Sequence, residues 1–266
     1  MGNDKVRHIL SVSGGKDSAA LAIYMRDRVP DMEYVFCDTE KELPETYDYL
    51  GRLEAILGKP LITLKDPRGG FDHWLKIFGN YLPSARMRWC TKHLKLFPFE
   101  RYIGDSLAIS YVGIRADEHR AGYIPTKPNI KPAFPFKEHG LCYSDIVGIL
   151  TDAGLGLPSY YKWRSRSGCY FCFFQQKIEW VGLLEHHPDL FKLACNYEKV
   201  DKKTGKRFTW CAGESLEELS RAERIAEIKM EYQQRIARDK LKRATLAEVL
   251  ELENEQGLQP CLICTL

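Results

Sequence analysis

The sequence lacks long apolar segments and shows little excess of charge of either sign. No apolar run approaches the length of about 20 residues that a membrane-spanning helix needs. The first residues, Met1 to Val6, have none of the apolar character of a secretory signal, so we expect a cytoplasmic protein without a membrane anchor. Lys and Arg total 39 against 36 Asp and Glu, and the resulting net charge of +3 argues neither for nor against nucleic-acid binding.

Cysteine, in contrast, is abundant. The chain has nine cysteines among 266 residues, an odd number. Without a secretion signal a disulfide framework is not expected, and the cysteines instead indicate metal ligation or thiol chemistry. The length fits one large domain or a domain with an appendage.

Short apolar runs alternate with helical stretches in the first 120 residues. Strands are predicted at residues 9–12, 34–37, 60–64 and 107–114, and helices at 19–28 and 46–57, with further helix from about Phe71. Strands separated by helices of this length are typical of parallel βαβ units. The pattern predicts an α/β fold with a doubly wound, mostly parallel sheet.

The rest of the chain differs from this part in amino-acid composition. Residues 121–166 are rich in Pro and Gly, with one short helix predicted at 144–150, and the chain from Gly213 onward is charged and helical. Capping boxes open helices at Ser215 and Thr245, and their charged residues suit a solvated face. We therefore expect a nucleotide-binding α/β domain (1–166), a cysteine-rich segment packed on it (167–212) and a helical C-terminal region (213–266).

A glycine-containing loop, Ser11-Val-Ser-Gly-Gly-Lys-Asp-Ser18, lies between the first strand and the first helix. Its two glycines permit a tight turn with N–H groups aimed inward, while the helix N-terminus and Lys16 add positive charge. The loop therefore predicts an anion cradle; a strand–helix turn without a ligand is the alternative. It is not a Walker A loop, whose spacing between the glycines is longer.

Three segments carry a resemblance to a known family. The hexapeptide Ser13–Ser18 resembles the signature of the PP-loop ATP pyrophosphatases, which cleave ATP between its α and β phosphates. The segment Val112–Arg120 is similar to the GxRxxE/D-xxR segment of the phosphoadenosine phosphosulfate reductase branch. The order of Lys131–Phe136 followed by Gly168-Cys-Tyr-Phe-Cys172 is also similar to that branch, and the resemblance covers about residues 6–195.

The resemblance implies an adenine nucleotide α-hydrolase-like fold that binds ATP with Mg²⁺. It implies a catalytic role for Lys16, Asp17 and Arg115. Asp38 and Thr39 would lie near the adenosine, although a carboxylate at a strand end is also a common turn residue, and Arg120 and Lys137 are further candidates. The residues implied to bind the nucleotide are Ser11, Ser13, Gly14, Gly15, Lys16, Asp17, Ser18, Asp38, Thr39, Gly113 and Arg115.

The spacing of Cys169 and Cys172 lets two thiolates reach one metal. Cys90 falls where the sulfonucleotide reductases carry a cysteine, and Cys195, which follows Cys172 by 23 residues, completes a set of four. Thiolate quartets bind zinc or iron–sulfur clusters, and the aromatic residues around Cys169 and Cys172 favour a [4Fe–4S] cluster over zinc. A site without metal is the remaining alternative.

The other cysteines have simpler interpretations. Cys142, like His93, is an alternative fourth ligand, and Cys37 lies within a strand, where core packing is expected. Cys261 and Cys264 near the end of the chain form either a mobile thiol pair or a reduced tail.

Basic and aromatic residues gather in two segments. Arg86, Arg88, Lys92 and Lys95 surround Cys90, and the segment Tyr160–Arg166 interleaves three aromatic with three basic residues. Such a mixture suits stacking on bases with neutralisation of phosphates, recognition of one nucleotide's phosphates, or a solvated surface.

The resemblance implies two enzymatic activities. In the first, ATP adenylates an acceptor and a sulfur nucleophile then displaces AMP, as in the iron–sulfur ATP pyrophosphatases of DNA phosphorothioation. A cysteine desulfurase or another sulfur donor would then be a partner, DNA or tRNA the acceptor, and a homodimer or larger modification complex the assembly. The second is reduction of adenylyl sulfate or its 3′-phosphorylated form, against which the absence of Cys-Cys at position 90 and of a C-terminal ECGLH segment counts. A non-catalytic nucleotide-sensing module is disfavoured because the phosphate loop is intact.

Overall fold

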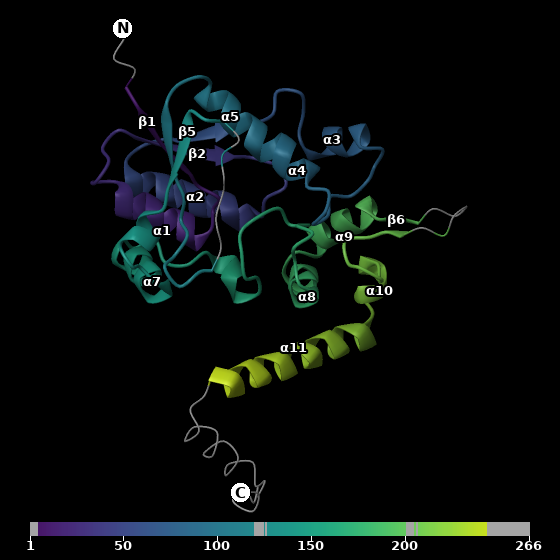
Figure 1. The fold of residues 1–266 in the computed structure, drawn as a ribbon. Helices are drawn as coiled ribbons and strands as arrows, with labels where there is room; N and C mark the ends of the chain where they lie inside the picture. The colour runs from purple at the N-terminus through teal and green to yellow at the C-terminus, as the bar shows by residue number, and fades with distance from the viewer. Residues whose placement is uncertain (1–4, 120–124, 126, 201–204, 206, 244–266) are drawn as a thin grey trace, which may run out of the picture. The chain divides into compact units, whose positions relative to one another are not determined.

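The computed structural model describes residues 5–119, 125, 127–200, 205 and 207–243. Its centre is a parallel five-stranded sheet with the order β3-β2-β1-β4-β5 (Figure 1). The order reverses at β1, so the sheet is doubly wound, which confirms the predicted fold class. The strands are β1 (Arg7–Ser11), β2 (Met32–Cys37), β3 (Leu61–Leu64), β4 (Ala108–Tyr111) and β5 (Ile130–Ala133).

Helices connect the strands as parallel crossovers require. The first, α1, begins at Lys16 rather than at the predicted Ala19, because Gly15 already serves as its N-cap. The second, α2, begins with a proline at its first position, where a missing N–H costs nothing. The elements between β1 and β4 are α1 (Lys16–Met25), α2 (Pro44–Leu57), α3 (Phe71–Ile77), α4 (Trp89–Thr91), a π-helical turn (Lys92–Leu96) and α5 (Phe97–Ile103).

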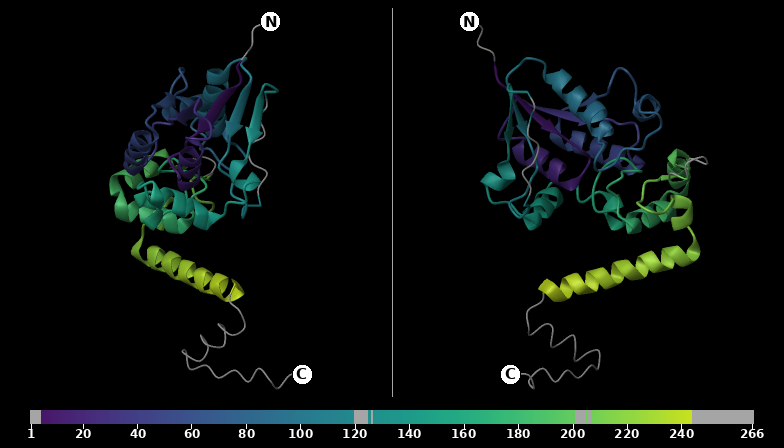
Figure 2. Two further views of the ribbon diagram at one scale, coloured as in Figure 1. Left: turned by 90° about the vertical axis from the view of Figure 1, so that its left-hand side faces the viewer. Right: turned by 45° about the vertical axis from the view of Figure 1, so that its right-hand side comes forward.

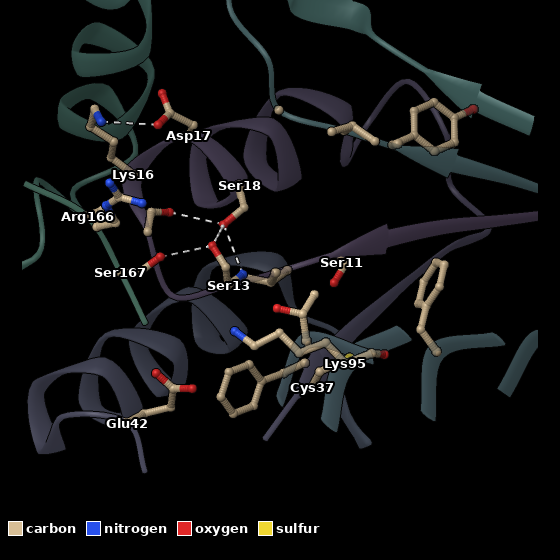
Figure 3. A pocket seen from close by; sticks show the side chains of 18 of the residues that line it. Ser11, Ser13, Lys16, Asp17, Ser18, Cys37, Glu42, Lys95, Arg166 and Ser167 are labelled. Atoms are coloured by element: carbon tan, nitrogen blue, oxygen red, sulfur yellow. Dashed lines mark hydrogen bonds and ion pairs between the residues drawn. The ribbon is translucent and has the colours of Figure 1, made fainter. Parts of the chain in front are cut away.

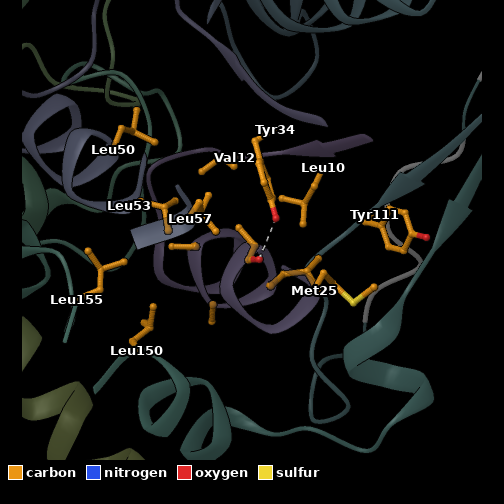
Figure 4. Close-up of a cluster of buried hydrophobic side chains, with 14 of the residues drawn as sticks. Leu10, Val12, Met25, Tyr34, Leu50, Leu53, Leu57, Tyr111, Leu150 and Leu155 are labelled. Atoms are coloured by element: carbon orange, nitrogen blue, oxygen red, sulfur yellow. Dashed lines mark hydrogen bonds between the residues drawn. The ribbon is translucent and has the colours of Figure 1, made fainter. Parts of the chain in front are cut away.

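Successive side chains along each strand point to opposite faces of the sheet, so the hydrophobic core is divided between the two faces. Helices cover both faces (Figure 2). Leu10 and Tyr34 point to the face where α1, α2 and α7 pack, a cluster seen in Figure 4. Their neighbours Ile9 and Val35 point to the opposite face, where Phe99 of α5 packs. The strand-and-helix alternation of the sequence thus becomes a three-layer domain with a buried sheet.

The fifth strand, β5, was not predicted from the sequence. It lies in the Pro-rich segment, and Pro132 stands within it, paired with Ser110 of β4. Proline is tolerated there because β5 is an edge strand and its outer side has no ladder to complete. The composition that suggested a loop therefore conceals a strand that extends the sheet beyond β4.

Shorter elements follow the sheet, including a helix where 144–150 was predicted. A helix begins at Leu216, directly after the predicted capping residue Ser215. The remaining elements are α6 (Pro135–Glu138), α7 (Tyr143–Asp152), a 3₁₀ turn (Ser159–Lys162), α8 (Lys177–His186), α9 (Pro188–Tyr197), β6 (Lys199–Val200), β7 (Arg207–Phe208), α10 (Leu216–Leu219) and α11 (Ala222–Arg243).

The chain divides into two compact units between Leu216 and Glu217. The predicted three-part organisation stays a prediction. None of the helices in the described ranges has the length and apolar character of a membrane span. Arg120, the capping box at Thr245 and the pair Cys261 and Cys264 lie outside the described residues.

Candidate functional site

The glycine loop crosses from the end of β1 to the start of α1, as the sequence predicts. Gly14 adopts a φ of +73°, a left-handed conformation that disfavours side chains, and Gly15 is extended at the N-cap. The N–H of Ser13 donates a hydrogen bond to the Ser18 hydroxyl oxygen at 3.1 Å, and the Ser18 hydroxyl donates to the Gly15 carbonyl at 3.1 Å. The loop is therefore closed on itself beside the α1 N-terminus, the arrangement that binds anions.

A segment distant in sequence braces this loop. The Tyr160 hydroxyl donates to the Gly14 carbonyl at 2.6 Å, and the hydroxyl oxygens of Ser13 and Ser167 lie 3.2 Å apart. The N–H of Lys16 donates to the Tyr161 hydroxyl oxygen at 3.4 Å. Burial raises the pKa of Tyr160, so its proton stays available to the carbonyl. The Tyr160–Arg166 patch of the sequence therefore contributes a wall of the site.

A cavity of about 660 Å³ opens beside the loop, at the carboxyl ends of the strands (Figure 3). This is the edge where doubly wound sheets bind ligands, next to the strand at which the order reverses. The lining residues are Ser11–Ser13, Gly15–Ser18, Phe36, Cys37, Glu42, Thr91, Lys95, Leu96, Phe99, Ser110–Gly113, Tyr161 and Ser165–Ser167.

Most of the predicted nucleotide-binding residues line this cavity. Gly14 does not line it, because it faces the Thr46 side chain of α2 on the other side of the loop. Gly113 lines it and packs closely on α1, since a Cβ at this position would lie 2.9 Å from the Asp17 carbonyl oxygen. The predicted residues in the lining are Ser11, Ser13, Gly15, Lys16, Asp17, Ser18 and Gly113.

Arg115 lies next to the loop but outside the cavity lining. Its guanidinium contacts Asp17 at 2.8 Å, Asp117 at 2.9 Å and Glu118 at 2.9 Å. Desolvation lowers the pKa of Arg115, but the hydrogen bonds to Asp17 and Asp117 outweigh it and the net shift is upward. Arg115 therefore holds Asp17, which also contacts the Lys16 ammonium at 3.1 Å.

The structure places Asp38 and Thr39 outside the cavity lining, although the resemblance implies a position near the adenosine. The Asp38 carboxylate accepts a hydrogen bond from Tyr47 at 2.8 Å and pairs with Lys65 at 3.2 Å. The buried Thr39 hydroxyl donates to Glu42 at 2.9 Å. These contacts are compatible with the structural role of the alternative interpretation, and the role of Asp38 at the adenosine stays a prediction. Lys137, on α6, also lies outside the lining.

The wall opposite the loop carries Glu42 and Lys95. Desolvation lowers the pKa of Lys95, but the charge of Glu42, together with interactions with nearby cysteines, outweighs it and raises the pKa overall. One carboxylate oxygen of Glu42 accepts the Thr39 hydrogen bond, while the other is buried without a hydrogen-bond partner in the described structure. The sequence shows Lys95 only as part of a basic segment. Its place in a cavity wall depends on the π-helical turn packing against the end of β2, where the Cys37 thiol donates to the Lys95 carbonyl at 3.5 Å.

The predicted four-cysteine metal site stays a prediction. Across the described ranges, no three His, Cys, Asp or Glu side chains are arranged to hold a metal ion. Cys169 lies 3.1 Å from the Thr39 hydroxyl, and the thiols of Cys90 and Cys172 interact electrostatically. Cys195 lies on α9, and His93 stacks on Trp74. Sequence spacing alone cannot decide this, because a quartet also requires the side chains of three separate segments to converge.

Two other described cysteines, Cys37 and Cys142, have structural surroundings. Cys37 packs in the core beside Val35, as predicted, and also lines the cavity. Burial raises its pKa to about 11, so it is a protonated thiol at neutral pH. Cys142 is the N-cap of α7.

Comparisons with known proteins agree with this architecture. Residues 7–128 match the model of the phosphoadenosine phosphosulfate reductase domain family. The chain is 28% identical over 122 residues to adenosine 5′-phosphosulfate reductase of Staphylococcus haemolyticus, covering 46% of this chain and 47% of that protein. Two uncharacterised proteins of Methanocaldococcus jannaschii are 28% and 26% identical, over 69% and 68% of this chain. The chain spans only 40% and 45% of the lengths of these two relatives.

A solved structure shows the same fold. The crystal structure of phosphoadenylyl-sulfate reductase from Candida auris, in a phosphate complex, superposes with a TM-score of 0.50 at 15% identity. The match covers 62% of this chain and 82% of that one. The α/β part of this chain is therefore similar in sequence to the phosphoadenosine phosphosulfate reductase domain and shares the fold of the Candida auris protein.

Proposed function

We propose that this chain is an enzyme of adenine nucleotides, an ATP pyrophosphatase that adenylates an acceptor for sulfur transfer. The observation that carries the proposal is the intact loop Ser13–Ser18, closed on itself and braced by Tyr160, beside a cavity large enough for a nucleotide. The loop N–H groups and Lys16 are the groups that suit a phosphate chain.

The chemistry follows from the charge that develops during the reaction. An acceptor oxygen forms a bond to the α phosphorus of ATP, and the bond from that phosphorus to the α–β bridging oxygen breaks. The departing pyrophosphate gains negative charge, which Lys16 and the N–H groups at the start of α1 stabilise. A sulfur nucleophile then displaces AMP from the adenylated acceptor, because AMP is a far better leaving group than an oxyanion.

Mg²⁺ is expected with the nucleotide, since it prefers oxygen ligands and shares them with phosphates. Asp17 is the carboxylate in the lining nearest the loop and would be its protein ligand, and Mg²⁺ would neutralise charge on the pyrophosphate. No step of this reaction requires the predicted metal cluster, and no group of three metal-ligating side chains is found among the described residues.

Sulfur would come from a cysteine desulfurase or another persulfide donor. For the acceptor we favour the DNA backbone, with a tRNA base as the second choice. We also propose that the chain assembles into a homodimer or a larger modification complex.

Reduction of a sulfonucleotide is the second candidate function. It is favoured by the match of residues 7–128 to the reductase domain family and by the identity to adenosine 5′-phosphosulfate reductase. A sulfonucleotide offers the same adenosine and α phosphate to the cavity as ATP does. The two activities therefore differ in the reaction of the group attached to the α phosphate.

Product analysis separates the two candidates. Purified protein is incubated with α-labelled ATP and Mg²⁺, alone and with DNA or tRNA, and the labelled products are resolved. AMP together with pyrophosphate supports the proposal. Sulfite from adenylyl sulfate or its 3′-phosphorylated form with a thiol reductant, without ATP cleavage, supports the reductase instead.

A pair of lysine variants ties the activity to the loop. Lys16→Ala removes the cation that faces the departing pyrophosphate, and we expect AMP formation to fall at least about 100-fold. Lys59→Ala removes a lysine that precedes β3, at the opposite edge of the sheet, and should leave AMP formation unchanged. Equal activity in the Lys16→Ala and wild-type proteins would contradict the placement of the phosphates.

A further inference from the structure

The cations that line the cavity differ in their carboxylate neighbours. The Lys16 ammonium contacts Asp17, and the charge of Lys95 is attracted by Glu42. Arg166 makes no ion pair with any residue in the described part of the chain, and its side chain is exposed. It is therefore a cavity cation without a counterion among the described residues.

Rigid neighbours fix the backbone that carries Arg166. Before it, the N–H and hydroxyl of Ser165 both donate to the buried Glu179 carboxylate, at 2.7 and 2.5 Å. After it, the Ser167 hydroxyl meets the Ser13 hydroxyl of the loop at 3.2 Å. The side chain thus starts from a point anchored both to α8 and to the phosphate loop, and Figure 3 shows it at the loop end of the cavity with Lys16.

An aromatic ring supports the Arg166 side chain. Its guanidinium carbon lies 5.2 Å from the centre of the Phe174 ring, a cation–π distance. Phe174 in turn packs on Phe173, with ring centres 4.3 Å apart. The ring orients the guanidinium without neutralising it, so the five N–H donors remain available to an anion.

The charge balance at the loop leaves a role for such a cation. Lys16 and Arg115 share Asp17, and Arg115 contacts two further carboxylates, Asp117 and Glu118. Two cations thus face three carboxylates before any ligand binds. A nucleotide that carries several phosphates would find the protein charge in this part of the site neutral or negative, so an unpaired cation in the lining would add to the attraction that Mg²⁺ supplies.

We propose that Arg166 is a phosphate-binding residue that holds the β and γ phosphates of ATP against the loop. This inference rests on the proposed function and adds to it a residue that discriminates a triphosphate from a monophosphate. Arginine suits the task because its planar guanidinium binds phosphate through two parallel hydrogen bonds.

Arg88 provides a matched control on the same ring. Its guanidinium carbon lies 4.8 Å from the centre of Phe174, and its side chain is also exposed, but it does not line the cavity. Arg88→Gln therefore removes the same charge from the same aromatic partner without touching the cavity. Arg166→Lys is a second variant, which keeps the charge and loses the paired geometry.

The test is equilibrium binding of two probes, α,β-methylene-ATP with Mg²⁺ and AMP, measured by titration calorimetry. In Arg166→Gln we expect affinity for the ATP analogue to fall about 10- to 100-fold and affinity for AMP to change less than about threefold. Arg88→Gln should change both affinities less than about threefold, and Arg166→Lys should be intermediate. The retained affinity for AMP verifies that each variant is folded.

Two outcomes overturn the inference and are distinguishable. If the wild-type protein prefers the ATP analogue and Arg166→Gln keeps that preference, Arg166 does not bind the phosphates although the proposed function stands. If the wild-type protein binds the ATP analogue no more tightly than AMP, the proposed function fails and the inference falls with it.

Discussion

Gly14→Ala should displace the phosphate loop, and the structure gives the size of the effect. Gly14 has a φ of +73°, which disfavours any side chain, and an added Cβ would lie 2.5 Å from the Thr46 Cγ2 atom. Thr46 is buried in the first turn of α2, so it has little room to move away. The substitution therefore combines backbone strain with a steric clash.

Gly58 separates these two contributions. It also has a positive φ, +63°, but a Cβ there would meet nothing within 4 Å. Gly58→Ala should cost about 1–2 kcal/mol of unfolding free energy, from the left-handed conformation alone. Gly14→Ala adds overpacking of about 1–3 kcal/mol, for a total of about 2–5 kcal/mol.

Urea unfolding followed by tryptophan fluorescence measures both costs, and calorimetry with the ATP analogue measures binding. We expect Gly14→Ala to weaken nucleotide binding, since the carbonyl held by Tyr160 must shift, and Gly58→Ala to leave it intact. Adding Thr46→Ser, which deletes the clashing methyl group, should restore about 1–3 kcal/mol to Gly14→Ala. Equal destabilisation by the two glycine substitutions, or no restoration by Thr46→Ser, would refute the reasoning.

Two further substitutions test the packing around the sheet. Tyr160→Phe should lower the unfolding free energy by about 1–3 kcal/mol and weaken nucleotide binding, because it leaves the Gly14 carbonyl without its buried donor; an unchanged urea midpoint would argue against this brace. The hydrogen bonds from Arg7 hold the pKa of Glu33 below its usual range, so this pair stabilises the fold above that range and the contribution is lost as the pH falls through the lowered pKa. The stability difference between wild type and Glu33→Gln should therefore shrink from about pH 6 to about pH 3, and a difference independent of pH would exclude this role.

Local patterns in the sequence were enough to predict most of the sheet. The four predicted strands are β1 to β4, and they were recognisable because each is a short, apolar run bounded by helix signals. The edge strand β5 was missed because proline, here Pro132, is typical of loops. Only the pairing of β5 with β4 shows that this segment is a strand. Edge position is a property of the assembled sheet, so no local rule could supply it.

The cysteines show what local spacing can and cannot predict. The spacing of Cys169 and Cys172 is a local feature, and the structure forms the expected turn, with the Cys172 N–H donating to the Cys169 carbonyl at 3.0 Å. Convergence with Cys90 and Cys195 is a long-range matter, and in the described part of the chain no group of metal-ligating geometry forms. Spacing predicts a turn reliably, but it does not predict which distant side chains meet there.

The sequence by itself determined the glycine loop at the start of α1 and the alternation of strands and helices, because glycine conformation and apolar periodicity act over a few neighbouring residues. Tertiary structure alone decided that Tyr160 and Ser167 brace the loop, that Arg115 holds Asp17, and that Arg166 lines the cavity. These contacts join residues about 100 to 150 positions apart, as in the separations of 98 for Arg115 with Asp17 and 146 for Tyr160 with Gly14. Such contacts depend on the order in which the strands assemble, which brings separate segments to one edge of the sheet.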